Sequence, residues 1–304
     1  MKAAIYTKRN SGKVLELADI NPPTPKPGEV LIKVLAASVN PLDWKLKSRH
    51  PGVDLAGEVV SVGSRVTRFK PGDAVFGAGK GAFSEYAVAR ESRLAAKPDN
   101  ISFEQVASLP IAGLTALQGL RDKGRLTTGQ KVLINGAAGG VGTFAVQIAK
   151  AFGAEVAGVC STSNLDMVRS LGADAVIDYT RQDFTRDPKR YDLLLDCVGN
   201  RALSDLRPVL APAGWCVLVG APKQWGAVLS RMFDLMVRSL ILRQRFLFFI
   251  ARFKPEDLQT LATLVETGRI RPVIDRRYPL AAAGDAMTYG ENGHARGKVI
   301  MTPA

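Results

Sequence analysis

A glycine-rich stretch, "INGAAGGVG" at residues 134–142, follows an apolar run and leads into a segment with helical spacing. Aligned on that helix, Ala137, Gly139 and Gly142 take the three positions of a dinucleotide-binding loop, with Ala137 replacing the first glycine. Gly139 would let the backbone approach a pyrophosphate, and the free N–H groups at the helix start would supply donors for the anion. The stretch lies between a predicted strand and a predicted helix, which is the context this motif requires. We therefore expect a dinucleotide site.

The residues after the second strand of this unit bear on which dinucleotide binds. An NAD site usually has Asp or Glu there to accept the ribose hydroxyls. This sequence has Ser161 and Thr162, and Tyr179 follows the next predicted strand. Hydroxyls can donate to a 2′-phosphate, so the pattern favours NADP (NADPH), although Ser163 stands where a basic residue would help. A loop that merely favours Ser and Thr is the alternative.

Two kinds of pattern along the chain predict the elements that carry these residues. The first hundred residues form short strands broken by Gly and Pro, which predicts a barrel-like β unit. Residues 102–120 have helical spacing, with Ser102 as the N-cap. Beyond them, continuous apolar strands alternate with helices, which is typical of a parallel sheet covered on both faces. The predicted fold class is α/β, and the final strand, "GKVIMT", would return to the first domain.

Composition limits the class of protein. The 304 residues are 46% hydrophobic and 23% charged, which is globular and long enough for two domains. Three scattered cysteines disfavour a disulfide framework, and no signal peptide or membrane span is evident, so we expect a cytoplasmic protein. The net charge of +13 admits nucleic acid, an anionic membrane or a phosphorylated ligand as a partner.

The chain resembles the zinc-free, quinone oxidoreductase-like branch of the medium-chain dehydrogenase/reductases, near the alkenal/quinone reductases and the reticulon-interacting reductase. The resemblance covers essentially the whole sequence and rests on several motifs in order, among them "AASVNPLDWKL", "GVDLAGEVVSVGSRVTRFKPGDAVFG", "LPIAGLTALQGL" and "GHARGKVI". It implies a GroES-like catalytic domain over residues 1–112 and 251–304. It also implies a Rossmann domain over residues 113–250, with the cofactor in the cleft between the two domains.

The resemblance assigns roles to individual residues. Asn40 would lie near the nicotinamide as a donor to the acceptor oxygen, with Lys45 as a second donor candidate and Asp43 as a structural residue. Zinc-dependent relatives have Cys where this chain has Asn40 and His where it has Val53, so we expect no zinc or other metal. The residues expected to bind the cofactor are Thr115, Gly139, Gly140, Val141, Ser161, Thr162, Tyr179, Val198, Val219, Gly220, Gly297 and Lys298.

Without a metal or a positioned acid, the chemistry favours acceptors that stabilise negative charge themselves. Quinones and α,β-unsaturated carbonyls spread the charge of an added hydride over their own conjugation, and the protein then supplies position. His50 and His294 are interpreted as surface residues. We therefore expect an NADPH-dependent quinone or enone oxidoreductase, with an enoyl-thioester reductase as a second enzymatic alternative.

Two features motivate a rival interpretation. Residues 46–52 form a short connection where relatives have a longer segment that lines the substrate pocket, so catalytic activity could be lost. Residues 225–254 combine apolar side chains with several arginines, and they could form an interfacial membrane helix or stack bases, although nothing else indicates nucleic-acid binding. The rival is a catalytically weak cofactor-binding protein with a basic partner surface. The interpretation favoured by the resemblance is a homodimer through residues 240–250, which would pair two edge strands.

Overall fold

The computed structural model describes residues 1–9, 12–46, 48–219, 243–293 and 295–303, and it divides into two compact units. Unit 1 comprises Met1–Leu114, Arg252–Gly268 and Pro272–Ala304. Unit 2 comprises Thr115–Ala251 and Arg269–Arg271. No helix among the described residues is long and apolar enough to cross a bilayer.

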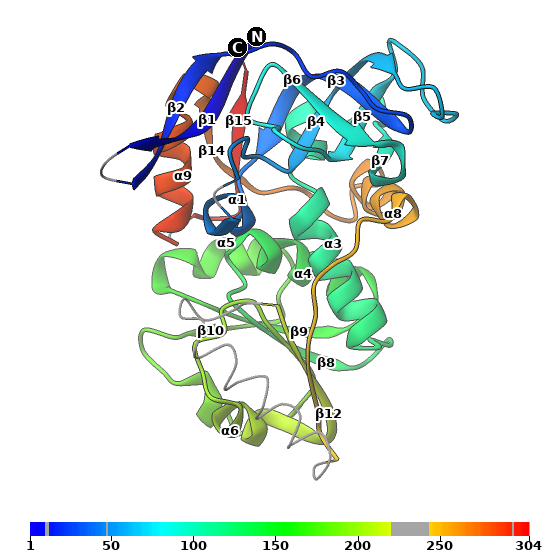
Figure 1. Cartoon of the computed structure of the whole chain (residues 1–304). Coiled ribbons are helices and arrows are strands. Elements are labelled where there is room, and N and C mark those ends of the chain that lie inside the picture. The colour runs from blue at the N-terminus through cyan, green and yellow to red at the C-terminus, as the bar shows by residue number, and fades with distance from the viewer. Residues whose placement is uncertain (10–11, 47, 220–242, 294, 304) are drawn as a thin grey trace. The chain divides into compact units, whose positions relative to one another are not determined.

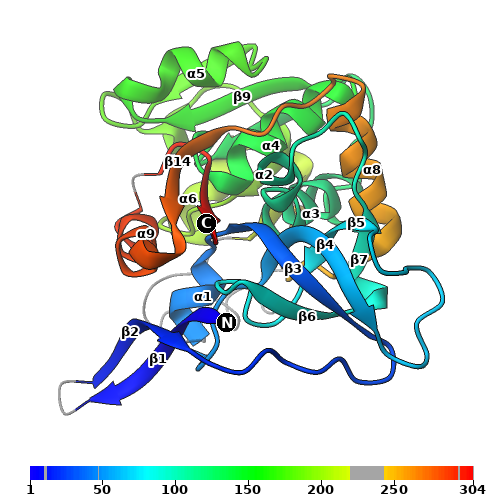
Figure 2. The ribbon, with the colours of Figure 1, turned by 90° about the horizontal axis from the view of Figure 1, so that it is seen from above.

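Unit 1 is built on a seven-stranded sheet in the order β14-β15-β3-β4-β5-β7, with β6 also paired to β3 (Figure 2). Apart from the parallel pair β14–β15, the pairings are antiparallel. Alternate residues of β3, Val30, Ile32 and Val34, are buried in the core of the unit, as period-2 patterning requires. The strands are β3 (Glu29–Ser38), β4 (Asp54–Val62), β5 (Ala74–Ala78), β6 (Tyr86–Arg90), β7 (Leu94–Ala96), β14 (Ile274–Pro279) and β15 (Lys298–Thr302).

The remaining elements of unit 1 surround this sheet. A separate antiparallel hairpin is formed by β1 (Lys2–Arg9) and β2 (Gly12–Asp19) (Figure 1). Strand β15 pairs with β3, with Ile300 opposite Ser38, so the C-terminal segment joins the sheet formed by the N-terminal third of the chain. The helices are α1 (Pro41–Leu46), α2 (Phe103–Ala107), α8 (Pro255–Glu266) and α9 (Ala283–Glu291).

Unit 2 contains a six-stranded sheet in the order β10-β9-β8-β11-β12-β13, and all its pairings are parallel. This confirms the predicted Rossmann sheet, because the order is that of a doubly wound dinucleotide-binding fold, with the strand order reversing between β8 and β11. Figure 1 shows β8, β9 and β10 side by side. The strands are β8 (Lys131–Asn135), β9 (Glu155–Cys160), β10 (Ala175–Asp178), β11 (Tyr191–Asp196), β12 (Leu210–Leu218) and β13 (Arg245–Phe248); the α-helices that follow them are α4 (Gly140–Ala151), α5 (Leu165–Ser170) and α6 (Leu203–Leu206).

The helical stretch predicted for residues 102–120 is interrupted. Ser102 caps α2 as predicted, in a reciprocal capping box with Gln105. The chain then breaks before Pro110, which starts α3 (Pro110–Gln118). Proline has no N–H to continue the preceding helix but fits the first position of a new one. The division between the two units falls inside α3, after Leu114.

Candidate functional site

The glycine loop joins the carboxyl end of β8 to the first turn of α4. Gly136 has a φ of +83°, which favours glycine, and the N–H groups of Gly136 and Ala137 donate to the Val159 carbonyl at 3.2 and 2.9 Å. Gly139 is the N-cap residue, and its carbonyl accepts the first helical bond from the Thr143 N–H at 2.9 Å. The N–H groups of the first turn, which begins at Gly140, have no intrahelical acceptor and point out of the helix end.

The two glycines of the motif meet different surroundings. A Cβ at Gly142 would lie 2.1 Å from the Gly136 carbonyl oxygen, so the fold itself requires glycine there. A Cβ at Gly139 would approach nothing closer than that same oxygen, at 3.5 Å. Folding therefore does not require glycine at position 139. Without a side chain, the backbone there leaves an open space at the start of the helix, which we call the cradle. That cradle suits a pyrophosphate.

The alanine that replaces the first glycine of the motif is compensated from the neighbouring strand. Ala137 is fully buried, and a Cβ placed on Gly158 of β9 would lie 3.0 Å from the Ala137 Cβ. The missing side chain at Gly158 therefore makes the room that the Ala137 methyl group occupies.

A buried pair of polar side chains ties the carboxyl ends of β8 and β11 together. Asn135 Nδ2 donates to Asp196 Oδ1 at 2.9 Å, and the same oxygen accepts the N–H groups of Val198 and Gly199 at 3.1 and 2.9 Å. The Val219 N–H donates to the Asp196 carbonyl at 3.0 Å. The expected nicotinamide-lining residues Val198 and Val219 are thus held by Asp196, while Gly220 lies outside the described residues.

The corner formed by the residues after β9 and β10, where Ser161, Thr162 and Tyr179 lie, also contains a carboxylate. This corrects the expectation that the polar side chains there are only hydroxyls. Asp178, at the end of β10, lies opposite Cys160 in the parallel register, which brings it beside Thr162. Thr162 Oγ1 donates to Asp178 Oδ2 at 2.5 Å, and Thr180 Oγ1 donates to Asp178 Oδ1 at 2.7 Å. These bonds, Thr162 first, hold the pKa of Asp178 below its ordinary value. Register across two strands, rather than sequence distance, creates this contact.

The other predicted residues of the corner are more open. Ser161 Oγ accepts from Asn164 Nδ2 at 3.0 Å and lies 3.3 Å from Ser163 Oγ. Tyr179 is 56% exposed, so the residue is accessible to a ligand.

Unit 1 holds a buried polar cluster centred on Asn40, which follows β3. The Asn40 amide nitrogen Nδ2 donates to the Ser38 carbonyl at 3.1 Å and to Asp54 Oδ2 at 2.9 Å. Its Oδ1 accepts from Lys298 Nζ at 2.6 Å, and its backbone N–H donates to Asp43 Oδ2 at 2.8 Å. Both side-chain hydrogens of Asn40 are therefore engaged with protein acceptors, and an acceptor oxygen would have to compete for one of them.

Burial sets the ionisation of this cluster. It raises the pKa of Asp43 to about 7 and that of Asp54 to about 6, although Lys298 opposes both shifts. Burial also lowers the pKa of Lys298. Asp43 accepts the Asn40 N–H and so fixes the turn from β3 into α1, and its purely structural role stays a prediction. Sequence reasoning missed Asp54 and the link from Lys298 to Asn40, since strand pairing brings together residues 258 positions apart.

The remaining predicted site residues of unit 1 and of α3 differ in their surroundings. The Lys45 side chain is exposed on the last turn of α1. Gly297 has a φ of +89°, and a Cβ there would lie 2.3 Å from the Val273 carbonyl oxygen, so the backbone itself requires glycine. Thr115 is half-buried in α3.

The short connection between α1 and β4 packs into unit 1. The Arg49 carbonyl accepts from the Tyr6 N–H at 2.9 Å, and the Pro51 and Gly52 carbonyls accept from Phe83 and Ala82. His50 in this segment is exposed, as interpreted from the sequence, while His294 lies outside the described residues. Within the described part of the chain, no group of three His, Cys, Asp or Glu side chains is placed to hold a metal ion.

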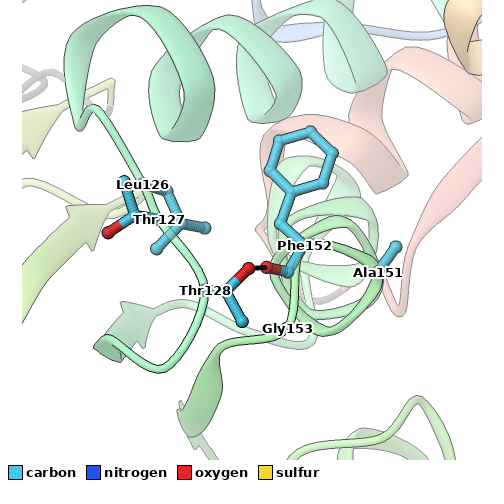
Figure 3. Close-up of a pocket in the computed structure, with 6 residues that line it drawn as sticks. All are labelled: Leu126, Thr127, Thr128, Ala151, Phe152 and Gly153. Carbon is cyan, nitrogen blue, oxygen red and sulfur yellow. Dashed lines mark hydrogen bonds between the residues drawn. The ribbon is translucent and has the colours of Figure 1, made fainter.

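A pocket elsewhere in unit 2 is unrelated to the glycine loop. It is lined by residues 126–128 and 151–153 (Figure 3), and Thr128 Oγ1 donates to the Phe152 carbonyl at 3.1 Å. These residues precede β8 or lie at the end of α4 and just after it, so the pocket lies at the amino end of the strands. Ligands of open α/β sheets bind at the carboxyl ends.

Comparison with known proteins gives consistent matches over the full chain. Residues 26–99 match the alcohol dehydrogenase GroES-like domain, and residues 171–301 match the zinc-binding dehydrogenase family. The chain is 35% identical to the chloroplast envelope quinone oxidoreductase homolog of Arabidopsis thaliana, over 100% of this chain and 98% of that protein. It is also 35% identical to the NADPH-dependent alkenal/one oxidoreductase, chloroplastic, of the same plant, covering 100% of this chain and 80% of the relative.

A solved structure agrees with these sequence matches. The quinone oxidoreductase from Coxiella burnetii superposes with a TM-score of 0.87 at 31% identity, covering 100% of this chain and 99% of that one.

Proposed function

Because the chain belongs to the zinc-free, quinone oxidoreductase-like branch of the medium-chain dehydrogenase/reductases, we propose that it transfers a hydride from NADPH to a quinone or an α,β-unsaturated carbonyl. The names of its relatives, quinone oxidoreductase and NADPH-dependent alkenal/one oxidoreductase, support this activity. The observation that carries the proposal is the bare cradle at Gly139, at the carboxyl end of β8 in a doubly wound sheet.

The residues of unit 2 fit a dinucleotide. The first-turn N–H groups that begin at Gly140 and Val141 would bind the pyrophosphate. Ser161, Thr162 and Tyr179 would surround the adenosine ribose, and Val198 and Val219 would line the nicotinamide. Bound there, NADPH would supply the hydride. Thr115, Gly297, Lys298 and Gly220 stay predictions from the family resemblance.

The cluster around Asn40 supports a conjugated acceptor. The Asn40 side chain already donates to Ser38 and Asp54, so it can offer an acceptor only a shared hydrogen bond. A quinone or enone needs no more than this, because its own conjugation takes up the charge of the added hydride. We assign Asn40 the role of orienting the acceptor, with Lys298 fixing the Asn40 amide through Oδ1. Lys45 remains a second candidate donor.

The experiment that tests this function follows oxidation of NADPH and of NADH with a small quinone and with an enone aldehyde as acceptors. NADPH-selective turnover with either acceptor is the expected result. Tight NADPH binding without turnover would instead indicate the catalytically weak alternative, which the oxidoreductase names of the relatives do not favour. Turnover only with a thioester-linked enoyl substrate would indicate an enoyl-thioester reductase.

Three finer predictions go with this function. A homodimer would form through residues 240–250, of which 243–250 lie within the described residues and include β13 at the edge of its sheet. Contact with a membrane surface through residues 225–254, of which 225–242 lie outside the described residues, stays a prediction. So does a cytoplasmic location, to be checked by fractionation, since both Arabidopsis thaliana relatives described above carry the chloroplast in their names.

A further inference from the structure

The corner formed by the ends of β9 and β10 presents a physical conflict for a cofactor with a 2′-phosphate. Asp178 is only 8% exposed, and its lowered pKa keeps it ionised at neutral pH. A phosphate arriving beside it would meet a like charge, which is unfavourable at short range.

Thr162 cannot relieve this conflict in the arrangement observed. A threonine hydroxyl has one hydrogen to donate, and Thr162 gives that hydrogen to Asp178 Oδ2. Thr180, 3.0 Å away, also donates to Asp178. The two hydroxyls shield the carboxylate but have no hydrogen left for a phosphate.

A cation lies at the same place. Arg181 Nε is 3.6 Å from Asp178 Oδ2, beyond hydrogen-bond distance, and the Arg181 side chain is 77% exposed. Its backbone N–H donates to the Asp178 carbonyl at 3.1 Å, which anchors the residue at the corner while the guanidinium stays loosely paired. The arginine half of this ion pair is exposed and the pair is too long for a hydrogen bond, so turning the guanidinium toward another anion costs little. Arg169 on α5, in contrast, is bound to Asp166 at 2.8 Å.

We propose that Arg181 and Asp178 together set the preference for NADPH over NADH, with Arg181 leaving Asp178 to bind the 2′-phosphate beside the exposed residue Tyr179. This inference rests on the proposed function, because it assumes that a dinucleotide binds at the carboxyl ends of the strands of this sheet. The positive charge of Arg181 attracts the 2′-phosphate, and so replaces the basic residue that is missing at Ser163. Asp178 weakens phosphate binding in proportion to its charge, and it can accept a ribose hydroxyl from NADH.

The test measures Kd for NADPH and for NADH by nicotinamide fluorescence, in the full-length protein and its variants. Arg181→Gln should weaken NADPH binding roughly tenfold, the size of one hydrogen bond to a charged group, and leave NADH binding unchanged. Asp178→Asn should strengthen NADPH binding, because the variant removes the like charge and can donate its amide hydrogen to Thr162, freeing that hydroxyl. Arg186→Gln, which removes the same charge from an exposed position on the following turn, is the matched control.

Competition by adenosine 2′,5′-bisphosphate and by AMP isolates the phosphate contact from the nicotinamide end. Arg181→Gln should lose affinity for the bisphosphate alone. Equal loss for both cofactors, or an effect no larger than that of Arg186→Gln, would overturn the role of Arg181 while leaving the proposed function intact. A wild-type protein that binds neither NADPH nor NADH would overturn both.

Discussion

Lys298 is a buried cation, and its partners among the described residues belong to unit 1. Its ammonium group contacts the Val39 carbonyl and Asn40 Oδ1, and it faces the carboxyl groups of Asp43 and Asp54. A buried charge is tolerated only when such partners accompany it. Removing one member of this cluster should therefore cost more than removing a surface charge.

Lys298→Met should lower the free energy of unfolding by roughly 3 kcal/mol, the usual cost of stranding a buried charge. Urea denaturation measures this value. Lys33→Met, at an exposed position on β3, is the control and should stay close to wild type. Equal stability of the two variants would show that Lys298 does not hold the cluster together.

The same cluster predicts how stability depends on pH. Asp43 and Asp54 have pKa values raised to about 7 and about 6, above those of an unfolded chain. The folded protein therefore keeps protons that the unfolded chain releases, so their contribution is full at acid pH and is lost as pH rises through 6 to 7. Lys298 has a lowered pKa and acts with the opposite sign, toward alkaline pH.

Asp43→Asn should flatten this dependence, because the amide cannot release the proton that Asp43 releases near pH 7. The measurement is the urea midpoint at about pH 5 and about pH 8, which bracket the titration. Asp19→Asn, at an exposed position, should keep the wild-type difference between the two pH values. An unchanged difference in Asp43→Asn would contradict the assigned ionisation.

Among the elements, the link between β8 and α4 offers a way to separate folding from ligand binding. Gly139 and Gly284 both have room in the chain for a Cβ, and neither has a positive φ. Gly139 begins the proposed pyrophosphate cradle, whereas Gly284 is exposed on α9 of unit 1. Alanine at the two positions is therefore a matched pair.

Gly139→Ala should change the free energy of unfolding by no more than about 1 kcal/mol, the scale of an N-cap substitution, yet weaken NADPH binding at least tenfold. Gly284→Ala should bind NADPH as the wild type does. The rise in Tm on adding NADPH reports binding in both variants, because a ligand stabilises the state it binds. A wild-type response in Gly139→Ala would place the cofactor elsewhere.

Local sequence signals predicted the elements well where one pattern dominates. The continuous apolar strands predicted the parallel sheet, and Ser102 predicted a helix start that the structure confirms. The break before Pro110 was missed because helical spacing continues across it, while the missing proline N–H ends the first helix. Asp178 and Asp54 were not predicted as site residues, because their partners depend on strand register and on the return of β15 to β3.

At the scale of the whole molecule, the edge of the sheet in unit 2 is where assembly would occur. Among the described residues, strand β13 ends the strand order and pairs with β12 on one side. Phe248 is 39% exposed and Ile250, just beyond the strand, is 79% exposed, so apolar side chains accompany the edge. An edge of this kind favours pairing with another strand, and a two-fold axis would join two such sheets through identical residues.

The double variant Phe248→Lys/Ile250→Lys should therefore convert the proposed dimer into a monomer, because lysines on an edge strand oppose strand pairing through charge and desolvation. Light scattering coupled to size exclusion gives the mass directly. Val60→Lys, at a 43% exposed apolar position in β4 of unit 1, controls for the added positive charge and should stay dimeric. A wild-type mass near 32.6 kDa, or a dimer that survives both lysines, would rule out assembly through this edge. If the monomer forms and still binds NADPH, dimerisation and cofactor binding are independent properties of unit 2.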